Sequence, residues 1–101
     1  MKSTSVSFAE SALADLQAIR QWYQDEGVPE IGIRFVTDII DKTQHLASHP
    51  EMGRIVQEFD LSFLRELIHP PFRIVYRRDA GQIKVVRVWR SERLLELPGE
   101  E

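Results

Sequence analysis

The residues best suited to chemistry in this chain are arginines, and they gather in one segment. Between Arg65 and Arg93, eight basic side chains accompany only three acidic ones, although the whole chain carries a net charge of −3. Arginine presents a planar set of donors that suits bidentate contacts with carboxylates and phosphates. A basic surface of this kind can meet nucleic acid or an acidic protein, and charge alone does not choose between them.

Cleavage of RNA would need more than cations, because a base and an acid must also move protons. Arginine is too strongly basic for that role. Glu58 or Glu66 could act beside the arginines, so a nuclease stays open as an alternative. No Ser/His/Asp set and no glycine-rich phosphate loop is present. The missing proton-transfer pair favours a protein that is not an enzyme, and we assign no catalytic residue.

The histidines do not predict a metal site. His45 and His49 lie four residues apart, a spacing that could hold zinc on a helix, yet no third ligand is recognisable. Zero cysteines exclude disulfides and thiolate ligands, which fits a reducing cytoplasm. No apolar run is long enough to span a membrane, and the N-terminus lacks a secretory signal. We therefore expect a cytoplasmic protein without metal, cofactor or membrane attachment.

The arginine segment predicts a β-hairpin. Over Phe72–Arg77, apolar and basic residues largely alternate, which places Arg73 and Arg77 on one face of a strand. Residues 79–81 supply the turn, and the apolar run Ile83–Trp89 predicts the second strand. Cationic donors would thus lie on the most rigid part of a small domain.

These side chains also have structural interpretations. The two strand arginines could make surface salt bridges with Glu58 or Glu66 on neighbouring strands. Arg54 could pair locally with Glu51. Trp89 could seal the edge of the core or form part of a groove for a partner segment.

Two helices and further strands complete the predicted fold. A short strand over Ser3–Phe8 precedes a helix over Ala9–Glu26, and Pro29 begins a second helix that runs to about His49. Their short connection predicts an antiparallel helical hairpin. Later periodicity predicts antiparallel strands over Arg54–Phe59, Leu64–His69, Phe72–Arg77 and Ile83–Trp89. We expect one α+β domain over residues 1–101, with the helices packed on one face of a twisted antiparallel sheet.

The predicted core joins the apolar stripe of each helix to the inward face of the hairpin strands. Phe72 and Tyr76 are expected on that face rather than as stacking platforms for bases. The core residues are Leu13, Leu16, Ile19, Phe35, Ile39, Leu46, Ile74, Tyr76, Val86 and Val88.

Six segments, taken in order, resemble a known family. They are Phe8–Ala12, Asp15–Ile19, Leu46–Arg54, Leu64–Leu67, Phe72–Arg77 and Val86–Arg93. Their order and spacing resemble the ParE branch of the ParE/RelE superfamily, the toxins of type II toxin–antitoxin pairs and plasmid stabilisation proteins. The resemblance implies a helical hairpin against a twisted antiparallel sheet.

The resemblance also implies partners and a target. A ParD-like antitoxin, with an N-terminal DNA-binding domain and a disordered C-terminal segment that wraps the toxin, would form a hetero-oligomer with this chain. RelE-like members cut messenger RNA in the ribosome, whereas ParE-like members poison DNA gyrase. Where some family nucleases carry a late His-Tyr or Tyr, this chain has Trp89-Arg90-Ser91, so the resemblance favours gyrase inhibition. A ribosome-dependent messenger RNA endonuclease of the RelE type is the alternative.

The expected contact surface is the Arg-rich sheet together with the segment from Trp89 to Leu97. An acidic, amphipathic antitoxin segment would set carboxylates against its cations. Direct DNA binding by the chain is not expected, because its overall charge is acidic. The residues assigned to target or antitoxin binding are Arg65, Arg73, Arg77, Trp89, Arg90 and Arg93, of which Arg65, Arg73 and Arg90 match family positions.

Overall fold

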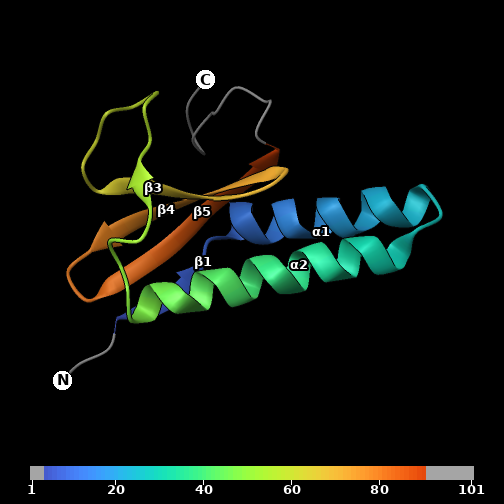
Figure 1. Cartoon of the computed structure of the whole chain (residues 1–101), viewed down its shortest axis with the longest axis horizontal. Helices are drawn as coiled ribbons and strands as arrows, with labels where there is room; N and C mark the ends of the chain where they lie inside the picture. The colour runs from blue at the N-terminus through green and yellow to red at the C-terminus, as the bar shows by residue number, and fades with distance from the viewer. Residues whose placement is uncertain (1–3, 91–101) are drawn as a thin grey trace.

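Two antiparallel helices lie against one face of a five-stranded sheet (Figure 1). The structure, a computed structural model, describes residues 4–90. The chain runs in order through β1 (Ser5–Phe8), α1 (Glu10–Asp25), α2 (Pro29–Gln44), a 3₁₀ turn (His45–Ala47), β2 (Arg54–Ile55), β3 (Leu64–His69), β4 (Phe72–Asp79) and β5 (Gln82–Arg90). The expected α+β fold, a helical hairpin packed on a mostly antiparallel sheet, is confirmed.

Local sequence sets the shape of the helical hairpin. Gly27 takes a positive φ of 83° directly after α1, a conformation that glycine adopts without strain. Pro29 then begins α2, where its missing N–H leaves no hydrogen bond unmade. A Cβ on Gly32 would lie 3.0 Å from the Cβ of Tyr23, so the absent side chain lets the helices approach closely. The prediction that the second helix reaches His49 is wrong, because α2 ends earlier and tightens into the 3₁₀ turn.

The sheet is antiparallel except at one edge. Its strand order is β1-β5-β4-β3-β2, and β2 to β5 form the expected antiparallel meander. β1 pairs in parallel with β5, and the helical hairpin provides the crossover that a parallel pair requires. The predicted strand over Arg54–Phe59 is wrong beyond its first two residues. Val56 donates its N–H to the Leu64 carbonyl at 3.2 Å, after which the chain turns and Asp60 takes a positive φ of 51°.

A β-bulge in β5 shifts the alternation of its side chains between the two faces of the sheet. The pairing with β4 skips Val86, because Val75 pairs with Arg87 and the next residue pairs with Val85. Val85 packs in the helix-side core, whereas Val86 packs on the opposite face. Ordinary strand alternation sends Val85 and Val86 to opposite faces, and the extra residue shifts the alternation so that Val88 packs in the helix-side core and Trp89 in the outer core.

The sheet is buried on both faces. The helix-side core is built from both helices and the inward side chains of β3, β4 and β5. On the other side, which we call the outer face, the chain between β2 and β3 crosses over the sheet (Figure 1). The buried residues of this outer core are Val56, Leu64, Val75, Val86 and Trp89, with Ala9 and Phe59 packed against them.

Most of the predicted core is confirmed. Leu16, Ile39, Leu46, Ile74, Tyr76 and Val88 are buried in the helix-side core, Ile19 and Phe35 are partly buried against it, and Val86 is buried in the outer core. Leu13 was also predicted in the core, and this prediction is wrong. Its side chain is 51% exposed, because Ala12 and Leu16 take the inward positions of that helical turn. Phe72 lies in the core, as expected.

Candidate functional site

Arg73 is the centre of a buried ion-pair cluster on the outer face. Its Nε donates to Glu66 Oε1 at 2.7 Å, and its two terminal nitrogens donate to the carboxylate of Glu58 at 2.8 and 2.9 Å. Arg54 Nε completes the cluster by donating to Glu66 Oε2 at 2.9 Å. The salt bridges foreseen for Arg73 are confirmed, but they are buried rather than on the surface, since Arg73 is 8% and Glu66 is 2% exposed.

The expected local pair between Arg54 and Glu51 is wrong. Arg54 is the register partner of Glu66 across β2 and β3, which brings their side chains together. Glu51 approaches Arg78 instead, with 3.9 Å between the charged atoms.

The ion pairs fix the charge state of the cluster. The hydrogen bond from Arg73 holds the pKa of the Glu58 carboxyl below its usual range. The same bond to Glu58 raises the pKa of the Arg73 guanidinium, against the effect of its own burial. With two guanidinium groups and two carboxylates, the cluster carries no net charge.

A second ion pair joins α1 to β5. Arg87 makes a bidentate contact with Asp15 at 2.8 and 2.9 Å, and Asp15 also accepts the N–H of Val88 at 2.8 Å. The guanidinium of Arg87 lies 4.1 Å from the ring centroid of Trp89. This clamp fixes the end of β5 and the indole beside it. Trp89 is 7% exposed and packs in the outer core, which confirms the interpretation that it seals the core edge. It also lines the groove described next, and its role in binding a partner segment stays a prediction.

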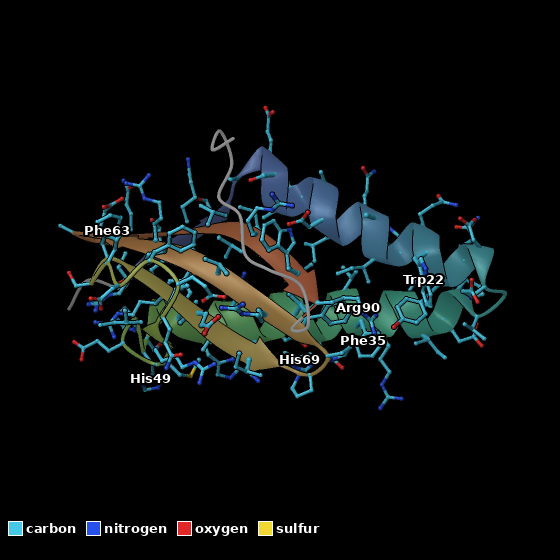
Figure 2. All side chains as sticks on the ribbon, turned by 90° about the horizontal axis from the view of Figure 1, so that it is seen from above. Trp22, Phe35, His49, Phe63, His69 and Arg90 are labelled. Atoms are coloured by element: carbon cyan, nitrogen blue, oxygen red, sulfur yellow. The ribbon has the colours of Figure 1, made fainter. Side chains whose placement is uncertain are left out.

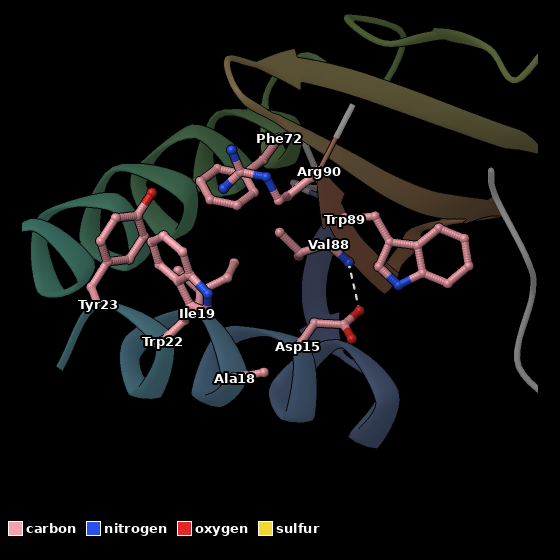
Figure 3. Close-up of a pocket in the computed structure, with 9 residues that line it drawn as sticks. All are labelled: Asp15, Ala18, Ile19, Trp22, Tyr23, Phe72, Val88, Trp89 and Arg90. Carbon is pink, nitrogen blue, oxygen red and sulfur yellow. Dashed lines mark hydrogen bonds between the residues drawn. The ribbon is translucent and has the colours of Figure 1, made fainter. Parts of the chain in front are cut away.

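An apolar groove opens between α1 and the ends of β4 and β5 (Figure 3). It encloses about 500 Å³. Trp22 stands over it, 54% exposed, with its ring edge against Tyr23 at a centroid distance of 4.8 Å. Arg90 lies at the opposite wall, with its guanidinium 5.8 Å from the ring centroid of Phe72. We call this the aromatic groove; it is lined by Asp15, Ala18, Ile19, Trp22, Tyr23, Phe72, Val88, Trp89 and Arg90.

A basic surface forms at the other end of the sheet, where β4 turns into β5. Arg77 and Lys84 are register partners there, and the Arg77 guanidinium lies 5.5 Å from the ring centroid of Phe63. We call the surface formed by Phe63, Arg65, Arg77, Arg78 and Lys84 the hairpin end. Figure 2 shows Phe63 at one extreme of the molecule and Trp22, Phe35 and Arg90 towards the other.

The six residues assigned to binding therefore do not form one site. Arg65 and Arg77 lie at the hairpin end, and Trp89 and Arg90 line the aromatic groove. Arg73 is the register partner of Trp89, but it is buried on the outer face in its ion-pair cluster. Arg93 lies outside the described residues. Their roles in binding stay predictions.

Several polar groups that could transfer protons or bind metal are engaged elsewhere. The buried hydroxyl of Tyr76 accepts the N–H of Gly53 at 2.9 Å and donates to the Pro50 carbonyl at 3.2 Å. Burial raises the pKa of this phenol. His45 has its Nδ1 2.9 Å from the Asp41 carbonyl oxygen. Within residues 4–90 no group of three potential metal ligands occurs, and no helix is long and apolar enough to cross a membrane.

The sequence analysis missed the groove residues of α1. Trp22 carried a signal, because it is a large aromatic side chain that lies off the inward stripe of its helix. Asp15 carried none, since its partner Arg87 is 72 residues away in the chain. Only the parallel pairing of β1 with β5 brings these two segments together.

Comparison with known proteins identifies close structural relatives. Residues 6–95 match the family model described as ParE toxin of type II toxin-antitoxin system, parDE. The structure is similar to a chain of the chromosomal ParDE toxin–antitoxin system from P. aeruginosa, with 26% identity, a TM-score of 0.76 and coverage of 89% of this chain and 98% of that one. It shares its fold with a chain of the RelBE2 toxin–antitoxin complex from Mycobacterium tuberculosis, at 17% identity and a TM-score of 0.65, covering 87% of this chain and 98% of that one. No curated protein sequence matches. The resemblance found in the sequence is confirmed.

Proposed function

The chain belongs to the ParE toxin family of type II toxin–antitoxin systems, and we propose that it inhibits DNA gyrase by protein contact and is neutralised by a ParD-like antitoxin. The antitoxin would supply the DNA-binding domain of the pair. The alternative within the same superfamily is ribosome-dependent cleavage of messenger RNA. The choice between them rests on what the arginines of the sheet are free to do.

The observation that carries the proposal is that the guanidinium of Arg73 already donates hydrogen bonds to two carboxylates. A ribonuclease stabilises the extra negative charge of the phosphate in its transition state with preorganised cations. Arg73 matches a family position for that role, but Nε and both terminal nitrogens already donate to Glu58 and Glu66. A phosphate approaching Arg73 would meet the Glu58 carboxylate first, because the Glu58 side chain is 35% exposed and that of Arg73 only 9%. This repulsion opposes cleavage at that point.

Proton transfer in the same region is also disfavoured. A carboxyl whose pKa is lowered, as in Glu58, is a weak base near neutral pH. Tyr76 has its hydroxyl buried between Gly53 and Pro50 on the helix side of the sheet, away from the outer-face cluster. Neither group forms the acid and base pair that cleavage needs.

The aromatic groove supports the antitoxin part of the proposal. Its apolar lining and volume suit the apolar face of an amphipathic helix, the mode in which many disordered segments fold on binding. Trp22 offers a large exposed ring as an anchor, and Arg90 offers a cation at the wall for a carboxylate of that helix.

One experiment separates the two mechanisms. The purified toxin is added in parallel to a gyrase supercoiling reaction and to ribosomes programmed with messenger RNA. We expect inhibited supercoiling and intact message. Codon-dependent cleavage with unaffected supercoiling would contradict the proposal and assign the chain to the nuclease branch. A sample premixed with the ParD-like protein encoded beside the toxin is the control, since neutralisation should abolish either effect.

A further inference from the structure

Two exposed cations lie side by side on the outer face of the hairpin end. Arg77 and Lys84 are register partners in β4 and β5, so their side chains project from the same face about 5 Å apart. Both residues are exposed, and neither forms an ion pair within residues 4–90. Asp79 follows two residues later on the same face, yet within that range it forms no ion pair with either cation.

Two further cations lie on the helix side of the same end. Arg65 donates to the backbone carbonyls of Ser62 at 3.1 Å and Gly53 at 3.3 Å, which orient its guanidinium without neutralising it. Arg78 lies 3.9 Å from Glu51, whose side chain is 79% exposed. An ion pair of that length at the surface contributes little to stability, so a partner's carboxylate could replace Glu51 beside Arg78 at little cost.

The hairpin end also offers apolar anchors. Phe63 is 42% exposed and Leu61 is 38% exposed in the loop before β3. The guanidinium of Arg77 lies over the Phe63 ring. Aromatic residues and arginine are the side chains that most often dominate the affinity of protein interfaces.

This surface is well separated from the aromatic groove. Phe72 pairs with Arg90 at one end of the β4–β5 ladder, and Asp79 pairs with Gln82 at the other. The Arg77–Lys84 pair of the hairpin end lies five residue steps along β4 from the Phe72–Arg90 pair, which is about 17 Å at roughly 3.4 Å per residue. A helix seated in the groove would leave the hairpin end exposed to solvent.

We propose that the hairpin end is a second interaction surface, which binds an acidic surface of the protein that the toxin inhibits. The inference rests on the proposed function, because it presumes a protein target. The exposed cations provide the charge complementarity, and Phe63 provides the apolar contact. The groove would serve the antitoxin, so the two partners would use opposite ends of one sheet.

A protein target fits this surface better than nucleic acid. Binding to duplex DNA weakens with salt in proportion to the phosphates neutralised, with a slope of about −0.9 for each. The four cations of the hairpin end, which are Arg65, Arg77, Arg78 and Lys84, would neutralise about four phosphates at most, fewer than the roughly six to ten contacts that make DNA binding steeply salt-dependent. These cations beside the exposed Phe63 suit a short acidic protein segment.

The test is a pair of charge-reversal variants. R77E/K84E alters the hairpin end, and R20E/R34E makes the same change in net charge at two exposed helix positions outside both surfaces. R77Q/K84Q serves as the milder second variant, and circular dichroism with a melting curve checks the fold of each. Three quantities are measured for every variant. They are growth inhibition on induced expression, affinity for the neighbouring ParD-like protein by calorimetry, and binding to a 20-base-pair DNA duplex and a 20-nucleotide RNA by fluorescence anisotropy.

We expect R77E/K84E to lower growth inhibition by roughly tenfold or more, while its affinity for the antitoxin stays within about threefold of the wild type. R20E/R34E should remain toxic, and neither nucleic acid should bind. If the wild type is toxic and R77E/K84E is equally toxic, this inference is overturned but the proposed function is not. The same holds if R77E/K84E loses antitoxin affinity in parallel with toxicity. It also holds if the wild type binds DNA or RNA in a salt-sensitive way that this variant abolishes. A wild type that does not inhibit growth would overturn the proposed function and this inference with it.

Discussion

Arg73 and Arg77 lie four residues apart on the same face of β4, and their surroundings differ in every respect. Arg73 is 8% exposed and donates to two carboxylates, whereas Arg77 is exposed and stacks on Phe63. The neighbouring strands cause the difference. Arg77 faces Leu64 on one side and Lys84 on the other, so the sheet offers it no carboxylate.

The alternation of side chains along a strand therefore determines which face of the sheet an arginine occupies, but it does not determine what that arginine can bind. One arginine holds the loop between β2 and β3 against the outer face, because Glu58 belongs to that loop. The other is free to bind a partner. Treating both as one basic surface would join a cation with a structural role to one that we propose binds a partner.

Removing each arginine in turn is the strongest test of this contrast. R73A should lower the free energy of unfolding by about 3–5 kcal/mol, because it leaves the buried Glu66 carboxylate with only Arg54 as a partner. R77A should change it by less than about 0.5 kcal/mol, as exposed substitutions usually do. Urea unfolding of the two variants measures both. Equal losses would mean that burial of the Arg73 cluster contributes nothing to stability.

The same contrast between buried and exposed positions occurs within the helices. I39A should cost roughly 2–5 kcal/mol, because Ile39 is fully buried and truncation leaves a cavity in the helix-side core. L13A should cost far less, since Leu13 is half-exposed. Thermal melting of both variants checks the difference. A large loss from L13A would show that this leucine packs in solution as the sequence predicted.

Exposed residues of the aromatic groove should affect partner binding more than folding. R90E should weaken antitoxin affinity by about 2 kcal/mol, since it places a negative charge where a carboxylate is expected. W22A should have an effect of similar size by removing the anchor. Calorimetry with the ParD-like protein measures both, and R20E on the outward side of α1 is the matched control. Unchanged affinity in R90E and W22A would exclude the groove as the antitoxin site.

The smallest expected effect is a pH dependence of the Arg73 cluster. The pKa of Glu58 is lowered in the folded protein, so its contribution to stability is complete above its unfolded value of about 4.5 and is lost as pH falls through the folded value. The wild type should therefore be more stable than E58Q at neutral pH, and the gap should close on acidification below about pH 4. Denaturation midpoints at several pH values measure the gap. A gap that widens at low pH would have the wrong sign for this ion pair.

Local patterns predicted the elements well where one face of a strand or helix was enough to define them. β3 begins at Leu64 and ends at His69 as expected, and the helical hairpin follows from Gly27 and Pro29. Leu13 was misplaced because Ala12, one position away, fits the inward side better than a leucine does. A helical stripe cannot distinguish neighbours at that resolution.

Features built by distant segments could not be predicted from the sequence. The outer core needs Val56 and Phe59 to leave the expected strand and fold over the sheet, which is a tertiary event. The aromatic groove needs Trp22 and Arg90, which β1 and α1 bring together only in the finished fold. The sequence identified the individual cations, but the side chains that each of them contacts depend on the register of the strands.

The parallel pair of β1 and β5 has a consequence for the order in which this protein is made. The first strand of the described fold has its only sheet partner there in the last strand, so β1 cannot join the sheet until the ribosome has synthesised the paired residues Gln82–Val85 of β5. Long-range pairings of this kind close late in folding, because their loop entropy is lost before any contact is gained. Asp15 likewise waits for Arg87. A chain that ends before β5 would therefore lack both the groove and the complete hairpin end, and we expect such a fragment not to inhibit growth.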